Sequence, residues 1–366
     1  MICPTCHGTG QVPVTTVSVL TYGAKGDGVA DDTAAIQRAL DSYRPGTVLE
    51  FLASRVFRHT KVLDVTVPGT QIAGPGKLLA AMEGASALRI AAADVGVSNL
   101  TLTTPSTTRR WDTPAQAKVH LDRCTGARLT GVVIDGSGAT GVFIQGASYY
   151  TLTDCRVSST RADGIHNTGG SHHGTITRAV VNGSGDDGIS VVSYLGEPIC
   201  HDIVIASPTV KNQKGGRGLS VVGGTGIAIT NAAVLHSWAA AIYIAAEKEW
   251  STHGCTNVSV KGGILTESNT DTATDHGAVL IYNSQPDQPS TGITITDLTI
   301  KDTRTTTSRQ TGLVQYDGGA STRVTMDRLT IIGGNKWLYS GNAPASATRR
   351  RGWTWNGAPV ADVAGW

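Results

Sequence analysis

The sequence lacks the features that mark membrane-spanning and nucleic-acid-binding proteins. Charged residues make up only 16% of it, the formal net charge is +2, and no basic helix or arginine stripe precedes the short basic run at residues 349–351. This pattern argues against a nucleic-acid partner and favours a solvated position for that run. No apolar run approaches the roughly 20 residues that cross a bilayer, and the N-terminus shows no secretory signal peptide. If the protein acts outside a cell, we expect it to leave by another route.

Cysteines are few, and their spacing does not indicate a disulfide framework. Four of them are spread widely through the repeating part of the chain: Cys124, Cys155, Cys200 and Cys255. Isolated cysteines of this kind are typical of small buried apolar residues in a reducing compartment.

A CxxC motif stands in the leader, residues 1–16. The segment from Cys3 to Gly10 resembles half of the cysteine- and glycine-rich zinc module of some chaperones, but a structural zinc site needs four ligands and this segment offers at most three. We expect an exposed leader that binds no metal unless another subunit completes the site. We predict no cofactor and no metal elsewhere in the protein.

Glycine is abundant, with 45 residues, and threonine, serine, valine and alanine dominate the remainder, whereas aromatic residues make up only 5%. This mixture suits short strands and tight turns rather than long helices. Although the chain has 366 residues, no shift in composition marks two globular halves. We therefore predict one elongated all-β domain with small additions at its ends.

A four-residue pattern occurs three times in the middle of the chain, as DGIH, DGIS and RGLS, beginning at Asp163, Asp187 and Arg217. Each copy has a polar residue, a glycine, a branched apolar residue and a second polar residue, which is typical of one strand of a coil. If the copies stack as turns of a parallel β-solenoid, neighbouring copies lie about 4.8 Å apart. The three first residues then form one column of ionisable side chains.

The same period extends along the chain. The apolar residues that mark it are Val142, Ile165, Ile189, Leu219, Ile242, Ala278 and Leu313. Their steps of 23, 24, 30, 23, 36 and 35 residues indicate coils of similar length with insertions in three of them. A second strand with aliphatic inward residues recurs in each coil. We predict a parallel β-helix of about ten coils over residues 17–332.

Two stretches break this pattern. Residues 104–118 contain two prolines, Arg109, Arg110 and Trp111, so we expect them to loop out and form a wall of a binding groove. Residues 333–366 hold four of the seven tryptophans. We predict that this segment forms a terminal cap or a subunit contact.

Residues 17–40 closely resemble the N-terminal segment of pectate-lyase-like right-handed β-helix proteins, in which a first strand leads through a glycine-rich turn to a short helix. The resemblance implies a single-stranded right-handed parallel β-helix with an N-terminal capping helix, here near residues 32–42. Asp31 or Asp32 can cap this helix, so we assign both to capping rather than catalysis. An apolar face covers the open end of the solenoid, and it consists of Ile36, Ala39 and Leu40.

The acidic strands resemble the active-site strands of polygalacturonases and related glycoside hydrolases of this fold, in the order Asp163-Gly, Asp186-Asp187-Gly and Gly-Arg217-Gly. The resemblance implies inverting hydrolysis by the three aspartates, with one protonating the leaving oxygen and the others activating water. Close carboxylates also repel one another, so at least one should keep its proton near neutral pH, as a general acid requires. We assign Asp186 as the general acid and expect Asp163 and Asp187 to position the water.

Two departures from polygalacturonases bear on the substrate. Their histidine between two glycines is Arg217 here, which cannot relay a proton but can hold a carboxylate or an acidic sugar. Their Arg-Ile-Lys strand corresponds to Tyr-Ile-Ala at residues 243–245, so both substrate-binding cations are missing. We therefore do not expect a galacturonate polymer as the substrate.

A second polar column suits hydrogen bonding to a neutral glycan. Its members are His166, Ser190, Ser220 and Tyr243. We expect His166, Arg217 and Tyr243 to bind substrate. His172 and His173 lie between the acidic strands, where we expect a contact at the rim of the site rather than a metal site.

The N-terminal segment also resembles tailspikes and minor tail proteins of bacteriophages, which bind or cut surface polysaccharide. Since no signal peptide is seen, we expect a virion protein on a phage tail, a homotrimer by analogy, whose partner is a host cell-surface polysaccharide. Three functions stay open: a glycoside hydrolase, a receptor-binding protein without turnover, and a polysaccharide lyase. The lyase ranks third because the acidic column lacks a nearby lysine. A purely structural role for Asp-Gly turns is also possible, although stacked like charges cost free energy.

Overall fold

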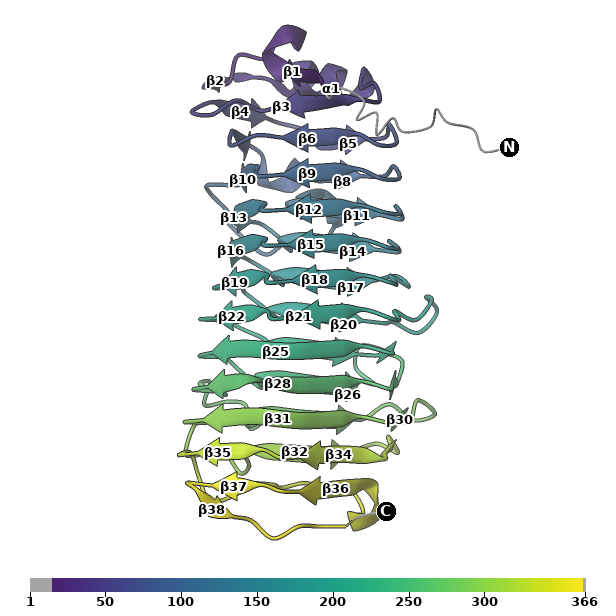
Figure 1. The fold of residues 1–366 in the computed structure, drawn as a ribbon, viewed down its shortest axis with the longest axis vertical. Helices are drawn as coiled ribbons and strands as arrows, with labels where there is room; N and C mark the ends of the chain where they lie inside the picture. Colours follow the sequence, from purple (N-terminus) through teal and green to yellow (C-terminus); the bar gives the residue numbers. More distant parts are fainter. Residues whose placement is uncertain (1–14, 365–366) are drawn as a thin grey trace, which may run out of the picture.

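The computed structural model describes residues 15–364, and the Cys3/Cys6 motif lies outside the described residues. Its strands stack as coils along one long axis, with α1 (Thr33–Asp41) at one end and the C-terminus at the other (Figure 1). Among the described residues, no helix has the length and apolar character needed to span a membrane. The predicted all-β, right-handed parallel β-helix with an N-terminal helix is confirmed.

One side of the β-helix is a ten-stranded parallel sheet with one strand per coil, and the other sheet continues beyond it at both ends, so the prediction of about ten coils holds for this side only. Its strands are β5 (Leu63–Val65), β8 (Leu88–Ile90), β11 (Val119–Asp122), β14 (Val142–Gln145), β17 (Ile165–Thr168), β20 (Ile189–Val192), β23 (Leu219–Val222), β26 (Ile242–Ala246), β29 (Val279–Asn283) and β32 (Thr311–Gln315).

The rest of the wall is a 24-stranded sheet made of two ladders. The first ladder includes β1 (Thr15–Ser18), β3 (Thr47–Glu50), β6 (Gln71–Ala73), β9 (Gly96–Ser98), β12 (Arg128–Thr130), β15 (Thr151–Thr153), β18 (Thr175–Thr177), β21 (Val204–Ala206), β34 (Val324–Asp327) and β36 (Thr348–Arg351). The second includes β2 (Asp27–Asp31), β4 (Val56–His59), β7 (Lys77–Ala80), β10 (Thr101–Thr103), β13 (Val133–Ser137), β16 (Arg156–Thr160), β19 (Val180–Asn182), β22 (Thr209–Lys211), β35 (Thr330–Ile332) and β37 (Thr354–Trp355).

The two ladders merge where single long strands span both of them. These strands are β25 (Ala228–Leu235), β28 (Ser259–Thr266) and β31 (Thr294–Lys301). A small four-stranded sheet forms at the turn between the larger sheets, from β24 (Gly224–Thr225), β27 (Cys255–Thr256), β30 (Ser290–Thr291) and β33 (Ser321–Thr322).

The observed register confirms the first five positions of the predicted period and corrects the last two. Val142, Ile165, Ile189, Leu219 and Ile242 pair one after another. The next partners are Val279 and Thr311, so the predicted Ala278 and Leu313 were wrong. Ala278 instead takes the small-residue position before the strand, and Thr311 is a polar residue at an inward position, which an apolar pattern overlooks.

The glycine of each DGI or RGL copy is required by close packing. A Cβ on Gly188 would lie 2.4 Å from a methyl group of Val210 and 2.5 Å from the carbonyl oxygen of Gly218. Gly164 is in the same position one coil earlier, with Val181 at 2.4 Å. The Asp-Gly pairs therefore do more than turn the chain, because they let the two sheets approach closely.

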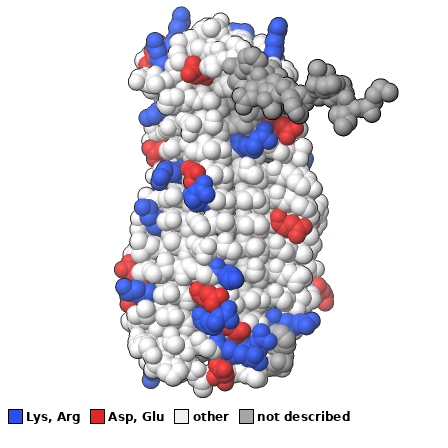
Figure 2. Space-filling model, viewed as in Figure 1, with Lys and Arg blue, Asp and Glu red and all other residues white. Residues whose placement is uncertain are grey.

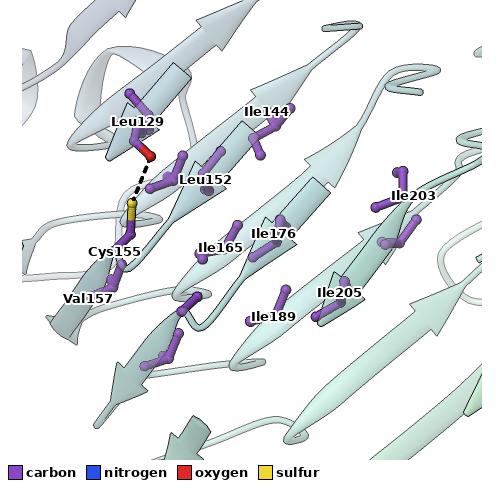
Figure 3. Packing of buried hydrophobic residues seen from close by; sticks show 14 of the residues in the cluster. Leu129, Ile144, Leu152, Cys155, Val157, Ile165, Ile176, Ile189, Ile203 and Ile205 are labelled. Atoms are coloured by element: carbon purple, nitrogen blue, oxygen red, sulfur yellow. Dashed lines mark hydrogen bonds between the residues drawn. The ribbon is translucent and has the colours of Figure 1, made fainter. Parts of the chain in front are cut away.

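The core is a stack of aliphatic side chains from successive coils. In Figure 3, Ile165 and Ile189 of the ten-stranded sheet face Ile176 and Ile205 of the 24-stranded sheet, and all four are fully buried. The predicted burial of the four spread cysteines is confirmed, and Cys155 donates its thiol to the carbonyl of Leu129 at 3.6 Å (Figure 3).

Helix α1 covers the N-terminal end of this core, as predicted. Its apolar face is buried and includes Ile36, Ala39 and Leu40. The capping is more complex than expected, because Asp32 occupies the N-cap but accepts hydrogen bonds from the backbone of Lys25 and Gly26. Asp31 instead accepts the N–H of Thr33 at 3.0 Å.

Parallel pairing continues past Ile332, where the repeat was expected to end. Strand β36 pairs with β34, β37 pairs with β35, and the short β38 (Ala358–Pro359) turns back antiparallel to β37. Trp353 is buried against the core and donates its indole N–H to the carbonyl of Met326 at 2.6 Å, whereas Trp337 is exposed. Part of the tryptophan-rich segment thus packs within the chain.

Charge is mixed over the face drawn in Figure 2, where Lys and Arg lie among Asp and Glu and no basic stripe follows the long axis. This face gives no footprint for nucleic acid.

Candidate active site

The three predicted aspartates lie together in one cleft on the outer face of the ten-stranded sheet. Asp163 stands two residues before β17, and Asp186 and Asp187 stand just before β20. The cleft has a volume of about 800 Å³ and is lined by all three aspartates, His166 and Arg217.

The column of Asp163, Asp187 and Arg217 is present as predicted. The N–H of Gly164 donates to the carbonyl of Asp187 at 3.0 Å, and the N–H of Gly188 donates to the carbonyl of Arg217 at 2.8 Å. These bonds place the three residues on adjacent coils, in register with the strands that follow them.

Of the three aspartates in the cleft, Asp163 loses its proton most readily. Its Oδ2 lies 2.7 Å from Nδ1 of His166 and accepts a 2.6 Å hydrogen bond from the hydroxyl of Ser190. Burial acts to raise the pKa of Asp163, but the hydrogen bond and charge of His166, the hydroxyl of Ser190 and the charge of Arg110 outweigh it and lower the pKa. A low pKa suits a base that stays charged.

Asp187 has the opposite electrostatic character. Its Oδ1 accepts the N–H of Arg217 at 2.7 Å and its Oδ2 accepts the hydroxyl of Ser220 at 2.5 Å. Burial raises the pKa of Asp187 to about 7; the charge of Arg217 lowers it, while the charges of Asp163 and Asp186 raise it further. Asp187 therefore holds a proton for much of the time near neutral pH.

Asp186 is the most open of the three, with a side chain that is 28% exposed compared with 8% for Asp187. Burial and the charge of Asp163 raise its pKa, although an ion pair with Arg110, 2.7 Å from Nη1 to Oδ2, acts in the other direction. Asp186 thus combines a raised pKa with access to the cleft, as a general acid requires.

Arg217 is held in place by three neighbouring side chains. Its Nη2 lies 3.1 Å from Oε1 of Glu247, its Nη1 lies 4.0 Å from Oδ1 of Asp187, and its guanidinium lies 4.3 Å above the ring of Tyr243. The hydroxyl of Tyr243 donates to the same Glu247 oxygen at 2.8 Å. Arg217 is therefore paired with Glu247 and lies close to Asp187 where it lines the cleft.

Tyr243 belongs to the second polar column, as predicted, but it does not face the cleft. The column of His166, Ser190, Ser220 and Tyr243 is confirmed by strand register. Tyr243 is only 2% exposed and does not line the cleft. It supports Arg217 and Glu247 rather than contacting a sugar, whereas His166 does line the cleft.

The predicted loop forms one wall of the cleft, which is lined by Arg110, Trp111 and Pro114 of residues 104–118. Trp111 is anchored by its backbone N–H, which donates to the carbonyl of Gly138 at 2.9 Å. Arg109 stacks over the Trp111 ring at 3.7 Å.

Sequence reasoning missed the opposite side of the cleft. Tyr194 and Glu197 follow β20, and Glu247 and Trp250 follow β26. Both segments lie in coils that the spacing had marked as containing insertions, so coil length was a signal that these loops approach the site.

His172 and His173 do not line the cleft. They lie in the turn between β17 and β18, beyond the opposite end of β17 from Asp163. The expected contact at the rim of the site is therefore not supported by the geometry, since β17 separates these histidines from the aspartates.

Comparison with known proteins places the chain in a family. The model of rhamnogalacturonase A/epimerase, pectate lyase-like proteins matches residues 16–277. The chain belongs to this family. A comparison with curated proteins finds no match.

Solved structures similar to this pectate lyase-like chain include both enzymes and an adhesin. The catalytic domain of GH87 alpha-1,3-glucanase in complex with nigerose is 15% identical with a TM-score of 0.72, and the match covers 96% of this chain and 66% of that domain. The GH87 catalytic unit from Streptomyces thermodiastaticus has a TM-score of 0.64 at 15% identity, with 95% and 70% covered. PfbA, a surface adhesin of Streptococcus pneumoniae, has a TM-score of 0.65 at 15% identity, with 93% and 90% covered. At this identity the likeness establishes the fold alone.

Proposed function

We propose that the protein hydrolyses a neutral polysaccharide by general acid/base catalysis at Asp163, Asp186 and Asp187. The observation that carries this proposal is the contrast within one cleft: neighbouring coils hold one carboxyl with a lowered pKa and two with raised pKa values. Paired carboxyls whose environments move their pKa values apart are the requirement for acid/base hydrolysis of a glycosidic bond.

The roles follow from access and charge. Asp186 protonates the glycosidic oxygen as the bond to the anomeric carbon breaks. Water attacks that carbon and gives its proton to Asp163, while Asp187 hydrogen-bonds and positions the water. We propose inversion of the anomeric centre, as the resemblance to polygalacturonases implies.

The spacing of the aspartates supports the choice of these three residues. Among the similar structures are GH87 alpha-1,3-glucanase domains that carry single aspartate-to-alanine substitutions and bind nigerose or tetrasaccharides. The substituted positions are 23 residues and then one residue apart. Asp163, Asp186 and Asp187 have the same spacing.

A neutral glycan suits the charges of the cleft better than a uronate polymer. Arg110 is paired with Asp186, and Arg217 is paired with Glu247, so neither cation is left to attract a carboxylate. Trp111 and Trp250 both line the cleft, and aromatic faces of this kind pack against the apolar faces of sugars. Neutral glucans are therefore the first substrates to test.

The experiment compares wild type, Asp186→Asn and Asp154→Asn on alpha-1,3-glucan and other neutral polysaccharides. Asp154 forms an exposed ion pair with Arg178 at 2.7 Å and does not line the cleft, so its substitution should leave activity unchanged. Asp186→Asn keeps the shape but removes the proton, so the rate of release of reducing ends should fall by roughly a hundredfold or more while glycan binding persists. Equal cleavage by wild type and Asp186→Asn would show that Asp186 is not the acid. Unsaturated products would indicate a lyase instead.

A second candidate is a receptor-binding protein without turnover. Arg110 holds the proposed acid at 2.7 Å, and the adhesin PfbA matches over nearly its whole chain. Binding of a cell-surface glycan by wild type with no cleavage under any condition would favour this function. Attachment to a phage tail as a homotrimer stays a prediction, to be tested by looking for the protein in purified virions and by measuring its mass in solution.

A further inference from the structure

Three histidines and an aspartate gather at the turns that follow β17 and β20. His172 and His173 lie in the first turn, and His201 and Asp202 lie in the second. Neighbouring coils bring the turns together, since His172 and His201 form a parallel backbone bridge. None of the four lines the cleft.

The backbone presents two of these side chains in equivalent positions. His173 has φ of 51° and Asp202 has φ of 53°, so each occupies the left-handed position of its own turn. Because the turns stack one coil apart, the two side chains project from the same corner of the β-helix. The site is therefore fixed by the coil repeat rather than by a flexible loop.

The donor atoms converge on one carboxylate oxygen. Oδ2 of Asp202 lies 2.8 Å from Nδ1 of His201 and 3.9 Å from Nε2 of His173. One donor atom from each of the three residues lies within 4.8 Å of the others. A tetrahedral zinc ion with bonds of about 2.0–2.2 Å needs its donors roughly 3.4 Å apart, and these partly exposed side chains can rotate to close the difference.

His172 is not one of the three donor residues, but it contacts both His173 and His201. Its Nδ1 lies 2.8 Å from Nδ1 of His173, and its ring stacks on His201 with centroids 4.7 Å apart. Tyr149 stacks on the ring of His173 with centroids 4.8 Å apart. A hydrogen bond to the far nitrogen of a ligating histidine is the usual second contact of a metal-bound imidazole, because it fixes the ring and its tautomer.

We propose that His173, His201 and Asp202 bind a divalent transition-metal ion, zinc in the first instance, which joins two neighbouring coils. Two imidazoles and one carboxylate select zinc, nickel or copper over magnesium or calcium, which prefer oxygen ligands. The remaining coordination position faces solvent. The site is separate from the acidic cleft, so it does not depend on the proposed hydrolysis.

The test uses the full chain without an affinity tag and with Cys3→Ser and Cys6→Ser, which removes the thiols of the leader as competing ligands. Titration of metal-free protein with zinc chloride in a calorimeter should give one bound ion per chain, and zinc should raise the thermal midpoint. His201→Ala should abolish both effects. His172→Ala should weaken binding by roughly 10–100-fold, as expected for a residue that orients a ligand.

His236→Ala is the matched control, since His236 and Glu267 form an exposed His–carboxylate pair at 3.2 Å that belongs to no group of three potential metal ligands within residues 15–364. It should bind zinc like the parent protein. Because His201 is partly exposed, the metal-free thermal midpoint of His201→Ala should equal that of the parent and show that the variant folds. No binding by the parent, or undiminished binding by His201→Ala, overturns the proposal.

Discussion

Replacing Asp187 by asparagine should stabilise the protein at neutral pH, although Asp187 lies in the proposed active site. Burial raises the pKa of this carboxyl from 3.8 to about 7. A group with a raised pKa in the folded state contributes stability that is present below its unfolded pKa and is lost as the pH rises through its folded pKa. The ionised Asp187 is therefore a cost that develops between about pH 4 and pH 7.

The size of this cost follows from the pKa difference. A shift from 3.8 to about 7 corresponds to about 4 kcal/mol at 1.36 kcal/mol for each pKa unit, and the pKa of about 7 already includes the attraction to Arg217. Asparagine preserves both hydrogen bonds, because its amide oxygen accepts the N–H of Arg217 and its amide group donates to the hydroxyl of Ser220. Asp187→Asn should therefore gain up to about 4 kcal/mol above pH 7 and nothing near pH 4.

The assay is urea unfolding of wild type and Asp187→Asn at several pH values from 4 to 8. Asp163→Asn is the matched contrast, because the pKa of Asp163 is lowered and its ionised form stabilises the fold above its unfolded pKa. That variant should lose stability at neutral pH and approach wild type as the pH falls. If Asp187→Asn is less stable than wild type by the same amount at every pH, the electrostatic reasoning fails and the residue acts through packing alone.

Two further predictions test the fold and the acid. Gly188→Ala should lower the free energy of unfolding by about 1–3 kcal/mol or more, because its Cβ would lie 2.4 Å from Val210. Gly84→Ala is the control and should be nearly neutral, because its Cβ meets only a ring atom at 3.8 Å. Equal losses of stability for the two variants in urea unfolding would contradict the packing argument. Arg110→Gln should raise the pKa of Asp186, since Arg110 lowers it. The fall in hydrolytic rate at high pH should then move to higher pH, and an unchanged pH profile would count against Asp186 as the acid.

The sequence was most informative where the coil repeat fixes position. A period near 23 residues with a constant polar-glycine-apolar order is enough to place Asp163, Asp187 and Arg217 in one column, because each coil brings the same backbone position to the same side of the sheet. The helix at the N-terminal end followed from its apolar face. The last two predicted positions of the period were wrong, because Thr311 stands at an inward position where an apolar residue was expected.

Residues in insertions were not predictable in the same way. Glu247 and Trp250 reach the cleft from a loop whose path depends on tertiary contacts, such as the 3.1 Å bond from the N–H of Lys248 to the hydroxyl of Ser284. Tyr243 was placed correctly in its column but assigned to substrate, because the sequence does not show that Arg217 covers it. The sequence also did not show that His173 and Asp202 are neighbours in space, since 28 residues lie between them.

The coil repeat supplies equivalent positions, and small differences between coils then give those positions different chemistry. Asp163 and Asp187 have the same backbone setting, and each accepts a hydroxyl from the next coil, from Ser190 and Ser220. The residue three positions on differs: Asp163 is followed by His166, which lies 2.7 Å from it, whereas Asp187 is followed by Ser190, which is bonded to Asp163 instead. His166, together with Ser190 and the charge of Arg110, lowers the pKa of Asp163, whereas burial and the charges of Asp163 and Asp186 raise the pKa of Asp187 to about 7. A solenoid can in this way place unlike acid and base groups one coil apart without any change in its backbone.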